Sequence, residues 1–204
     1  MVARQITRWR CAAAAALVGC ILVAGCSAAR PAAASASPPG SLGTLVLGGL
    51  RPVSGPAART YLGAVTGTNA LIGVVVQGTR ARAYLCDGAP GRAVTLADWF
   101  TGPVHGGMLD AVSGQHRVHF TVRLGQRTAT GTVTLADGRV FVFTAAMAAG
   151  SPPAGVFEGT GLLHGLSYHA GRIVLPDGDQ RGAAAFPTGP VKGRAISYLP
   201  LAPV

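Results

Sequence analysis

The chain has 204 residues, of which 49% are hydrophobic and 12% charged, and 17 basic against 7 acidic residues give it a formal net charge of +10. A basic surface suits anionic lipid headgroups, phosphate-bearing polymers or nucleic acid. Lys192 is the only lysine, and this bias toward arginine is also typical of a high-GC genome. The sequence has no RNP-like motif, zinc-finger spacing or compact basic helix, so we expect no nucleic-acid partner.

The N-terminal segment has the zones of an export signal. Arg4, Arg8 and Arg10 form a positively charged start, and residues 11–25 are almost wholly apolar. This apolar run is shorter than the roughly 20 residues that a membrane-spanning helix needs. We therefore expect residues 1–25 to be a cleaved signal peptide and not a permanent membrane anchor.

Residues 22–26, with the sequence Leu-Val-Ala-Gly-Cys, end this run. They resemble the lipobox of bacterial lipoproteins, in which a pair of small residues precedes a cysteine that is diacylated on its sulfur. The resemblance implies that Cys26 carries a diacylglycerol group, becomes the first mature residue and can take a third chain, such as palmitate, on its amine. Two acyl chains anchor a protein stably, so we expect lipid attachment at the extracytoplasmic face of the cell membrane.

Of the four cysteines, only one is expected to keep its thiol in the mature chain. Cys11 and Cys20 lie in the signal segment, and the sulfur of Cys26 would be consumed by the lipid, so Cys86 has no partner for an intramolecular disulfide. A reactive thiol or an intermolecular bridge is one interpretation. A lone cysteine at the end of an apolar strand is more often a small buried hydrophobe, which is the state we expect.

The mature chain divides into a tether, one domain and a tail. Residues 26–57 are rich in Ala, Ser, Pro and Gly and are expected to form a flexible tether, with an apolar island at residues 45–47 that could dock as a stray strand. Residues 58–190 are long enough for one domain with a real core, and residues 191–204 form a C-terminal tail.

Turn signals such as Asp-Gly and Gly-Gly recur through this domain between short runs rich in Val, Thr, Phe and Tyr. This spacing is typical of an all-β domain, a single antiparallel β-meander that closes into a barrel or folds as a sandwich. Residues 95–100 are the exception and predict one short helical turn, which Thr95 can cap. The expected strands cover residues 60–66, 70–77, 80–86, 107–112, 116–123, 127–135, 139–146, 154–159, 170–176 and 179–186.

Two turns predict the register of the central hairpins. Asp137 and Gly138 suit a two-residue type I′ turn, which pairs Thr134 with Phe141 and Thr132 with Phe143. A turn at Leu124 and Gly125 would pair Arg123 with Gln126 and His119 with Thr130. The two hairpins then share an apolar face, which carries residues such as Phe120, and a polar face that carries Arg117, His119, Thr121, Arg123, Thr128, Thr130, Thr132, Thr134, Phe141 and Phe143.

This polar face is the candidate ligand-binding surface, with Arg117, His119, Arg123, Phe141 and Phe143 as its binding residues. The arginines would supply charge-assisted hydrogen bonds and the phenylalanines a stacking surface for a glycan or an anionic polymer. The alternative is that threonines and arginines occupy the ordinary solvent side of a half-buried sheet, with the phenylalanines packed under a neighbouring segment.

No metal or cofactor site is expected. His116 and His119 are three residues apart and His164 and His169 five, so on a strand the members of each pair point to opposite faces. No cysteine or second histidine stands at zinc-like spacing.

Catalysis is not expected either. The sequence lacks a Gly-x-Ser-x-Gly elbow, and a carboxylate beside Cys86 would raise the pKa of its thiol. The acids Asp110 and Glu158 could form a glycosidase pair only if the fold brought them together. We therefore expect a protein that is not an enzyme.

Residues 84–88 (Tyr-Leu-Cys-Asp-Gly) and 99–102 (Trp-Phe-Thr-Gly), followed by glycine-punctuated strands, resemble a pattern in actinobacterial, mycobacterial-type cell-envelope lipoproteins. The resemblance covers roughly residues 60–186 and implies an architecture and a host class, but no activity. We expect non-enzymatic binding of an envelope glycan, lipid or protein partner. The alternatives are a barrel cavity for a small or lipidic molecule, an enzyme acting on cell-wall polymers, and a structural component of an envelope complex.

Overall fold

The computed structural model describes residues 45–114, 117–148, 153–187 and 196–203. These residues belong to one compact unit, Pro38–Val204, and form thirteen strands and no helix, which confirms the all-β antiparallel domain. No helix in the described ranges is long and apolar enough to cross a bilayer. The predicted signal peptide, Cys26 and most of the predicted tether lie outside the described residues.

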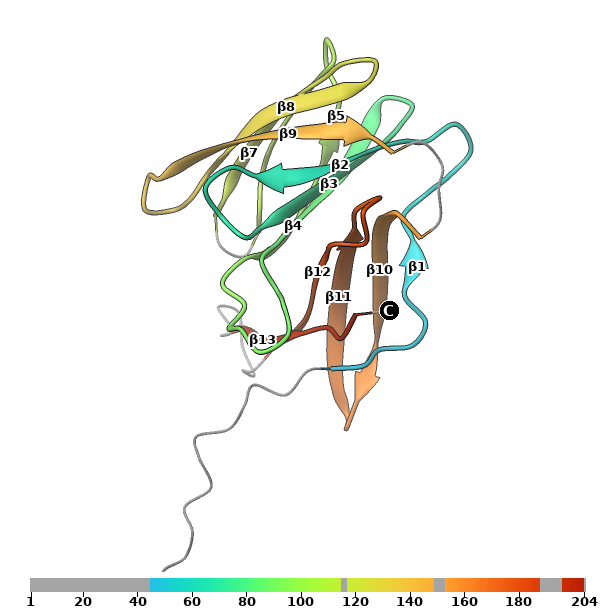
Figure 1. Cartoon of the computed structure of the whole chain (residues 1–204), viewed down its shortest axis with the longest axis vertical. Coiled ribbons are helices and arrows are strands. Elements are labelled where there is room, and N and C mark those ends of the chain that lie inside the picture. Colours follow the sequence, from blue (N-terminus) through green and yellow to red (C-terminus); the bar gives the residue numbers. More distant parts are fainter. Residues whose placement is uncertain (1–44, 115–116, 149–152, 188–195, 204) are drawn as a thin grey trace, which may run out of the picture. The chain divides into compact units, whose positions relative to one another are not determined.

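Eight strands form one antiparallel sheet in the order β5-β4-β3-β2-β9-β8-β7-β6 (Figure 1). Their bounds are β2 Arg59–Val65, β3 Leu71–Gln77, β4 Arg80–Cys86, β5 Ala97–Pro103, β6 Met108–Val112, β7 His119–Leu124, β8 Thr128–Thr134 and β9 Val140–Met147. The sheet curves until its edge strands β5 and β6 approach each other, and a Cβ atom on Gly102 would lie 2.8 Å from Leu109 Cδ1. The result is a nearly closed barrel.

The other five strands form a second antiparallel sheet in the order β1-β10-β11-β12-β13. Their bounds are β1 Arg51–Pro52, β10 Gly155–Leu163, β11 Leu166–Val174, β12 Gln180–Pro187 and β13 Ile196–Pro200. One face of this sheet packs against the outside of the barrel at β3 and β4, which therefore have apolar residues on both faces.

The apolar side chains gather in three clusters. The first fills the barrel and includes Phe100, Phe120 and Phe143. The second lies between the two sheets and includes Tyr84 and Ile173. The third covers the far face of the second sheet, where the N-terminal described residues lie; its members are Ala170, Ala184, Phe186, Leu201, Leu45, Leu47, Leu50, Leu163, Tyr168 and Leu199.

The predicted helical turn at residues 95–100 is wrong, because this segment enters strand β5. Trp99 stacks on Tyr84 outside the barrel, whereas Phe100 stacks on Phe120 inside it. Burial on both sides favours a period of two over a helical period. The Asp87 carboxylate accepts hydrogen bonds from the backbone amides of Thr95 and Leu96, so Asp87 holds this segment as a loop and Thr95 caps no helix.

Strands also form where a tether and a tail were predicted. Leu45 makes a parallel bridge to Leu201, and β1 pairs with β10 through Arg51 and Glu158. Strand β13 pairs with β12. The chain is therefore part of the domain from residue 45 onward, because its leucines complete the third cluster.

The predicted register of the second hairpin is wrong by one residue. Thr134 pairs with Val140 and Gly131 with Phe143. The loop has three residues, closed by a hydrogen bond from the Leu135 amide to the Arg139 carbonyl, and only Gly138 has a positive φ, of 86°. A one-residue slip exchanges the faces of a strand.

The register of the first hairpin differs from the predicted register by four residues. Because this shift is an even number, every residue still points to its predicted face. His119 pairs with Thr134 and not with Thr130, and Arg123 pairs with Thr130 and not with Gln126. The prediction that Phe120 and its apolar neighbours face the core is confirmed.

The expected buried state of Cys86 is confirmed, since this thiol is fully buried. Burial raises the pKa of Cys86 to about 12, and the hydrogen bonds that favour the thiolate do not offset this. We therefore expect Cys86 to resist a thiol reagent such as DTNB at pH 8 in native protein and to react fully in 6 M guanidinium. Comparable rates in the two states would contradict its burial.

Candidate functional site

The five residues of the predicted binding face do not lie together. Phe143 is 2% exposed, and it and Phe141 belong to the apolar cluster inside the barrel. His119 and Arg123 point to the opposite, outer face, and Arg117 precedes β7 with a φ of 53°. The predicted shared face is therefore wrong, because the register slip moved both phenylalanines into the core.

The outer barrel face keeps polar contacts of its own. His119 Nε2 lies 2.7 Å from Asp110 Oδ1, and the hydroxyls of Thr121 and Thr132 are 2.8 Å apart. These groups point away from the barrel interior, which is packed with apolar side chains, so they do not line a cavity there. Asp110 and Glu158 belong to different sheets and form no carboxylate pair.

A more elaborate polar cluster lies between the two sheets. Arg82 of β4 donates two hydrogen bonds of 2.6 Å to the carboxylate of Glu158 on β10, from Nη1 to Oε2 and from Nη2 to Oε1. The same Oε1 lies 2.8 Å from Nε2 of His169 on β11. Register explains the arrangement, because Thr160 pairs with His169 and Glu158 with Gly171, which directs both side chains toward the barrel.

Trp99 completes this cluster from β5. The Arg82 guanidinium lies 4.9 Å from the centre of the Trp99 ring, a cation–π distance. The ring stacks on Tyr84 at 4.5 Å and on His169 at 5.6 Å. These contacts hold Arg82 in one orientation at the junction of the sheets.

A groove of about 760 Å³ opens beside Arg82. Its polar lining includes Arg51, Ser54, Gln77 and Thr160. A pocket of about 290 Å³ shares Ser54, Gln77 and Arg82 with this groove and adds Arg80. Within the described ranges Arg51 and Arg80 form no ion pair. Arg51 in the groove and Arg80 in the adjoining pocket therefore add two cationic groups on either side of the fixed Arg82.

The carboxylate of Glu158 is held ionised. Partial burial acts to raise the pKa of Glu158, but hydrogen bonds and charge from Arg82 and His169 outweigh it, so the pKa lies below its ordinary value of 4.5. A carboxyl group with a lowered pKa does not retain a proton to donate near neutrality. Its evident role is to orient Arg82.

This pKa predicts a pH dependence of stability. Because the folded-state pKa of Glu158 is below the unfolded one, ionised Glu158 stabilises the fold above pH 4.5, and the contribution disappears as pH falls through the lowered pKa. We expect Glu158→Gln to unfold at lower urea concentration than wild type at pH 7, with the difference narrowing toward pH 3. An equal difference at both pH values would contradict this assignment.

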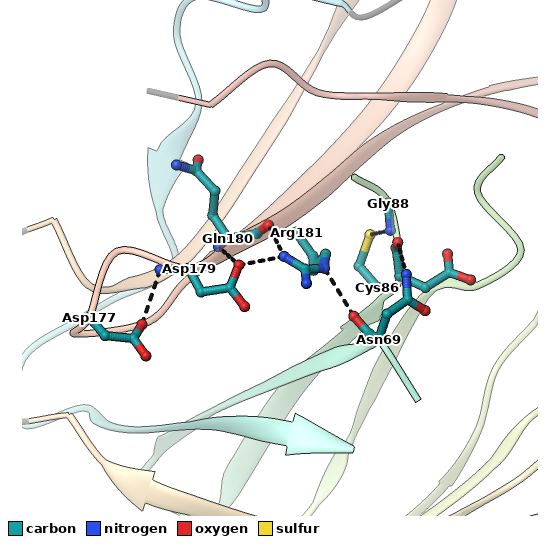
Figure 2. Close-up of polar contacts among 8 residues, drawn as sticks. Asn69, Cys86, Gly88, Asp177, Asp179, Gln180 and Arg181 are labelled. Atoms are coloured by element: carbon teal, nitrogen blue, oxygen red, sulfur yellow. Dashed lines mark hydrogen bonds and ion pairs between the residues drawn. The ribbon is translucent and has the colours of Figure 1, made fainter. Parts of the chain in front are cut away.

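Another polar group joins the turns at the edge of the interface (Figure 2). Arg181 donates to the backbone oxygen of Asn69 at 2.9 Å and to Asp179 at 2.5 Å, and the Gly88 amide donates to Cys86 Sγ at 3.3 Å. Arg181 of β12 thus reaches the loop between β2 and β3 through Asn69, so this group connects the two sheets. In the described part of the chain no three His, Cys, Asp or Glu side chains gather as metal ligands.

Sequence reasoning missed the Arg82 cluster. Arg82 and Glu158 are 76 positions apart, and no local pattern pairs them. One signal was present: Arg82 alternates with Tyr84 and Cys86 on the face of β4 that packs against the second sheet. A charged residue in such a row requires a partner from another element.

Comparison of the chain with protein-family models, curated proteins and solved structures finds no match.

Proposed function

We propose that the mature protein is a lipid-anchored cell-envelope protein whose β-domain binds an anionic envelope ligand without catalysis. The anchor is Cys26, and the domain is displayed on the extracytoplasmic face of the cell membrane. The ligand carries phosphate or carboxylate groups and lies in the groove beside Arg82.

The groove carries this proposal. Arg51 and Arg80 are exposed and have no carboxylate partner among the described residues, whereas Glu158 holds Arg82 in place. Guanidinium groups bind phosphate and carboxylate through paired hydrogen bonds. Ser54, Gln77 and Thr160 add polar groups that suit the hydroxyls of a glycan or polyol phosphate.

Binding is favoured over catalysis by the chemistry of the lining. The carboxylate at the groove is engaged by Arg82 and His169. No serine–histidine or cysteine–histidine pair lines the groove in the described ranges. An enzyme acting on wall polymers would require an available acid or nucleophile.

Titration calorimetry with soluble poly(glycerol phosphate) and with inorganic phosphate tests the site. We expect Arg51→Gln/Arg80→Gln to weaken polymer binding at least tenfold at 50 mM salt. The matched control is Arg117→Gln/Arg123→Gln, which removes the same charge from the outer barrel face and should leave affinity within twofold. Equal losses in both variants would indicate a diffuse charge effect, and loss in the control alone would move the site to the barrel face.

The anchor has a separate test. Mass spectrometry of protein purified from membranes should show an N-terminal Cys26 that carries two or three acyl chains. A free thiol at Cys26, or an intact residue 1–25 segment, would contradict the anchor.

A further inference from the structure

The hairpin of β10 and β11 ends in an exposed apolar tip. Leu162 is 73% exposed and Leu166 56% exposed. His164 and Gly165 form the turn between Leu163 and Leu166 with φ values of 49° and 79°, the two positive values that a type I′ turn requires. Leu163 pairs with Leu166, so regular pairing continues to the turn.

The base of this tip is rigidly held. Leu163 and Tyr168 belong to the third apolar cluster, together with Leu45, Leu47 and Leu50. The Tyr168 ring covers Gly161, where a Cβ atom would lie 2.8 Å from the tyrosine hydroxyl oxygen. The supported hairpin therefore presents one exposed leucine on each side of its tip, Leu166 on the face of Tyr168 and Leu162 on the opposite face.

The N-terminal described residues cross the far face of the second sheet, the face that carries Leu163 of the hairpin (Figure 1). Leu45 and Leu47 share a cluster with Leu163 of the hairpin, and Val46 between them is 80% exposed. Only residues 27–44 separate Leu45 from Cys26. Even fully extended, this length reaches about 60 Å, so an acylated Cys26 would keep the tip close to a bilayer and raise its effective concentration there.

We propose that the tip formed by Leu162 and Leu166 inserts into the headgroup–acyl boundary of the membrane that carries the anchor. This inference rests on the proposed anchor at Cys26. Leucines exposed on both sides of the tip, with Tyr168 two residues from Leu166 on the same face, fit that boundary, because apolar side chains enter the acyl region while tyrosine is favoured at the headgroup level. The hairpin is a second, non-covalent contact that orients the domain on the bilayer.

A fluorescent label placed beside the tip tests the inference in the full lipidated protein. Ser167 is exposed and pairs with Leu162, so Ser167→Cys carries the label and leaves both leucines in place. Cys86 is buried and stays unlabelled. The protein is reconstituted into vesicles of phosphatidylglycerol and phosphatidylethanolamine, with or without lipids that carry a shallow nitroxide quencher. The matched control label is Val142→Cys, at a site 56% exposed on the barrel.

We expect the Ser167→Cys label to shift to shorter wavelength and to be quenched at least threefold more than the Val142→Cys label. Adding Leu162→Asp/Leu166→Asp should return it to the control value. Equal, weak quenching at both sites while mass spectrometry shows an acylated Cys26 would overturn the inference and leave the anchor standing. A shift that depends on protein concentration without vesicles would overturn it in favour of self-association.

If mass spectrometry finds no acyl chain, the proposed anchor fails by itself. Vesicle-dependent quenching of the Ser167→Cys label would then still support membrane contact by the tip. An absence of quenching would overturn the tip insertion as well as the anchor.

Discussion

Replacing Phe120 with alanine should lower the free energy of unfolding by about 3–5 kcal/mol. Phe120 is completely buried and stacks on Phe100 at 4.8 Å and on Phe143 at 5.4 Å. The three rings come from β5, β7 and β9, so truncating the central ring removes contacts to strands from both halves of the barrel. Each strand of the wall is hydrogen-bonded to its neighbours in the sheet, so the barrel can collapse into the cavity only in part.

Urea unfolding followed by far-UV circular dichroism measures this loss. Val142→Ala is the control, since Val142 lies on strand β9 of the same sheet with 56% of its surface exposed, and its loss should stay within about 0.5 kcal/mol. A Phe120→Ala protein as stable as the Val142→Ala protein would mean that the barrel interior is not packed as described.

Much of this fold could be predicted from periodicity. Strands β2, β3, β4, β8 and β9 lie within one or two residues of their predicted bounds, because turn signals bound each of these short segments. Strand β5 was missed because Thr95 can cap a first helical turn. Only the burial of Trp99 and Phe100 on opposite sides of the sheet decides in favour of a strand.

The candidate site depended on information that is not local. Asp137 and Gly138 fit a two-residue loop and a three-residue loop equally well as a pattern, and the choice decides whether Phe141 and Phe143 face solvent or core. Packing of Phe143 against Phe120 selects the core. The pairing of Arg82 with Glu158 depends on how the two sheets meet, which no strand pattern contains.

Gly171→Ala should strongly destabilise the junction of the two sheets. A Cβ atom at position 171 would lie 2.5 Å from Cζ and 2.6 Å from Cε1 of Tyr84. Tyr84 is 1% exposed and stacked on Trp99, so its ring cannot retreat without moving a second aromatic residue. We expect a loss of about 2–3 kcal/mol, typical of an overpacked core.

The same substitution should also weaken ligand binding in the groove. Gly171 pairs with Glu158, so a displacement of β11 shifts the carboxylate that orients Arg82. We therefore expect weaker binding of poly(glycerol phosphate) to the folded Gly171→Ala protein, measured in the absence of urea. The effect distinguishes a site built at the sheet junction from a general attraction to positive charge, which a single methyl group would leave unchanged.

Gly161→Ala on β10 is the matched control. A Cβ atom there would also meet a tyrosine, at 2.8 Å from the Tyr168 hydroxyl oxygen, but Tyr168 is half-buried and its ring can turn toward solvent. We expect Gly161→Ala to cost less than about 1 kcal/mol. The double variant Gly171→Ala/Tyr84→Leu should lose less stability than the sum of the losses in the two single variants, because the smaller side chain at position 84 relieves the clash. Additive losses, or equal losses at positions 161 and 171, would show that Tyr84 does not limit how closely the sheets pack.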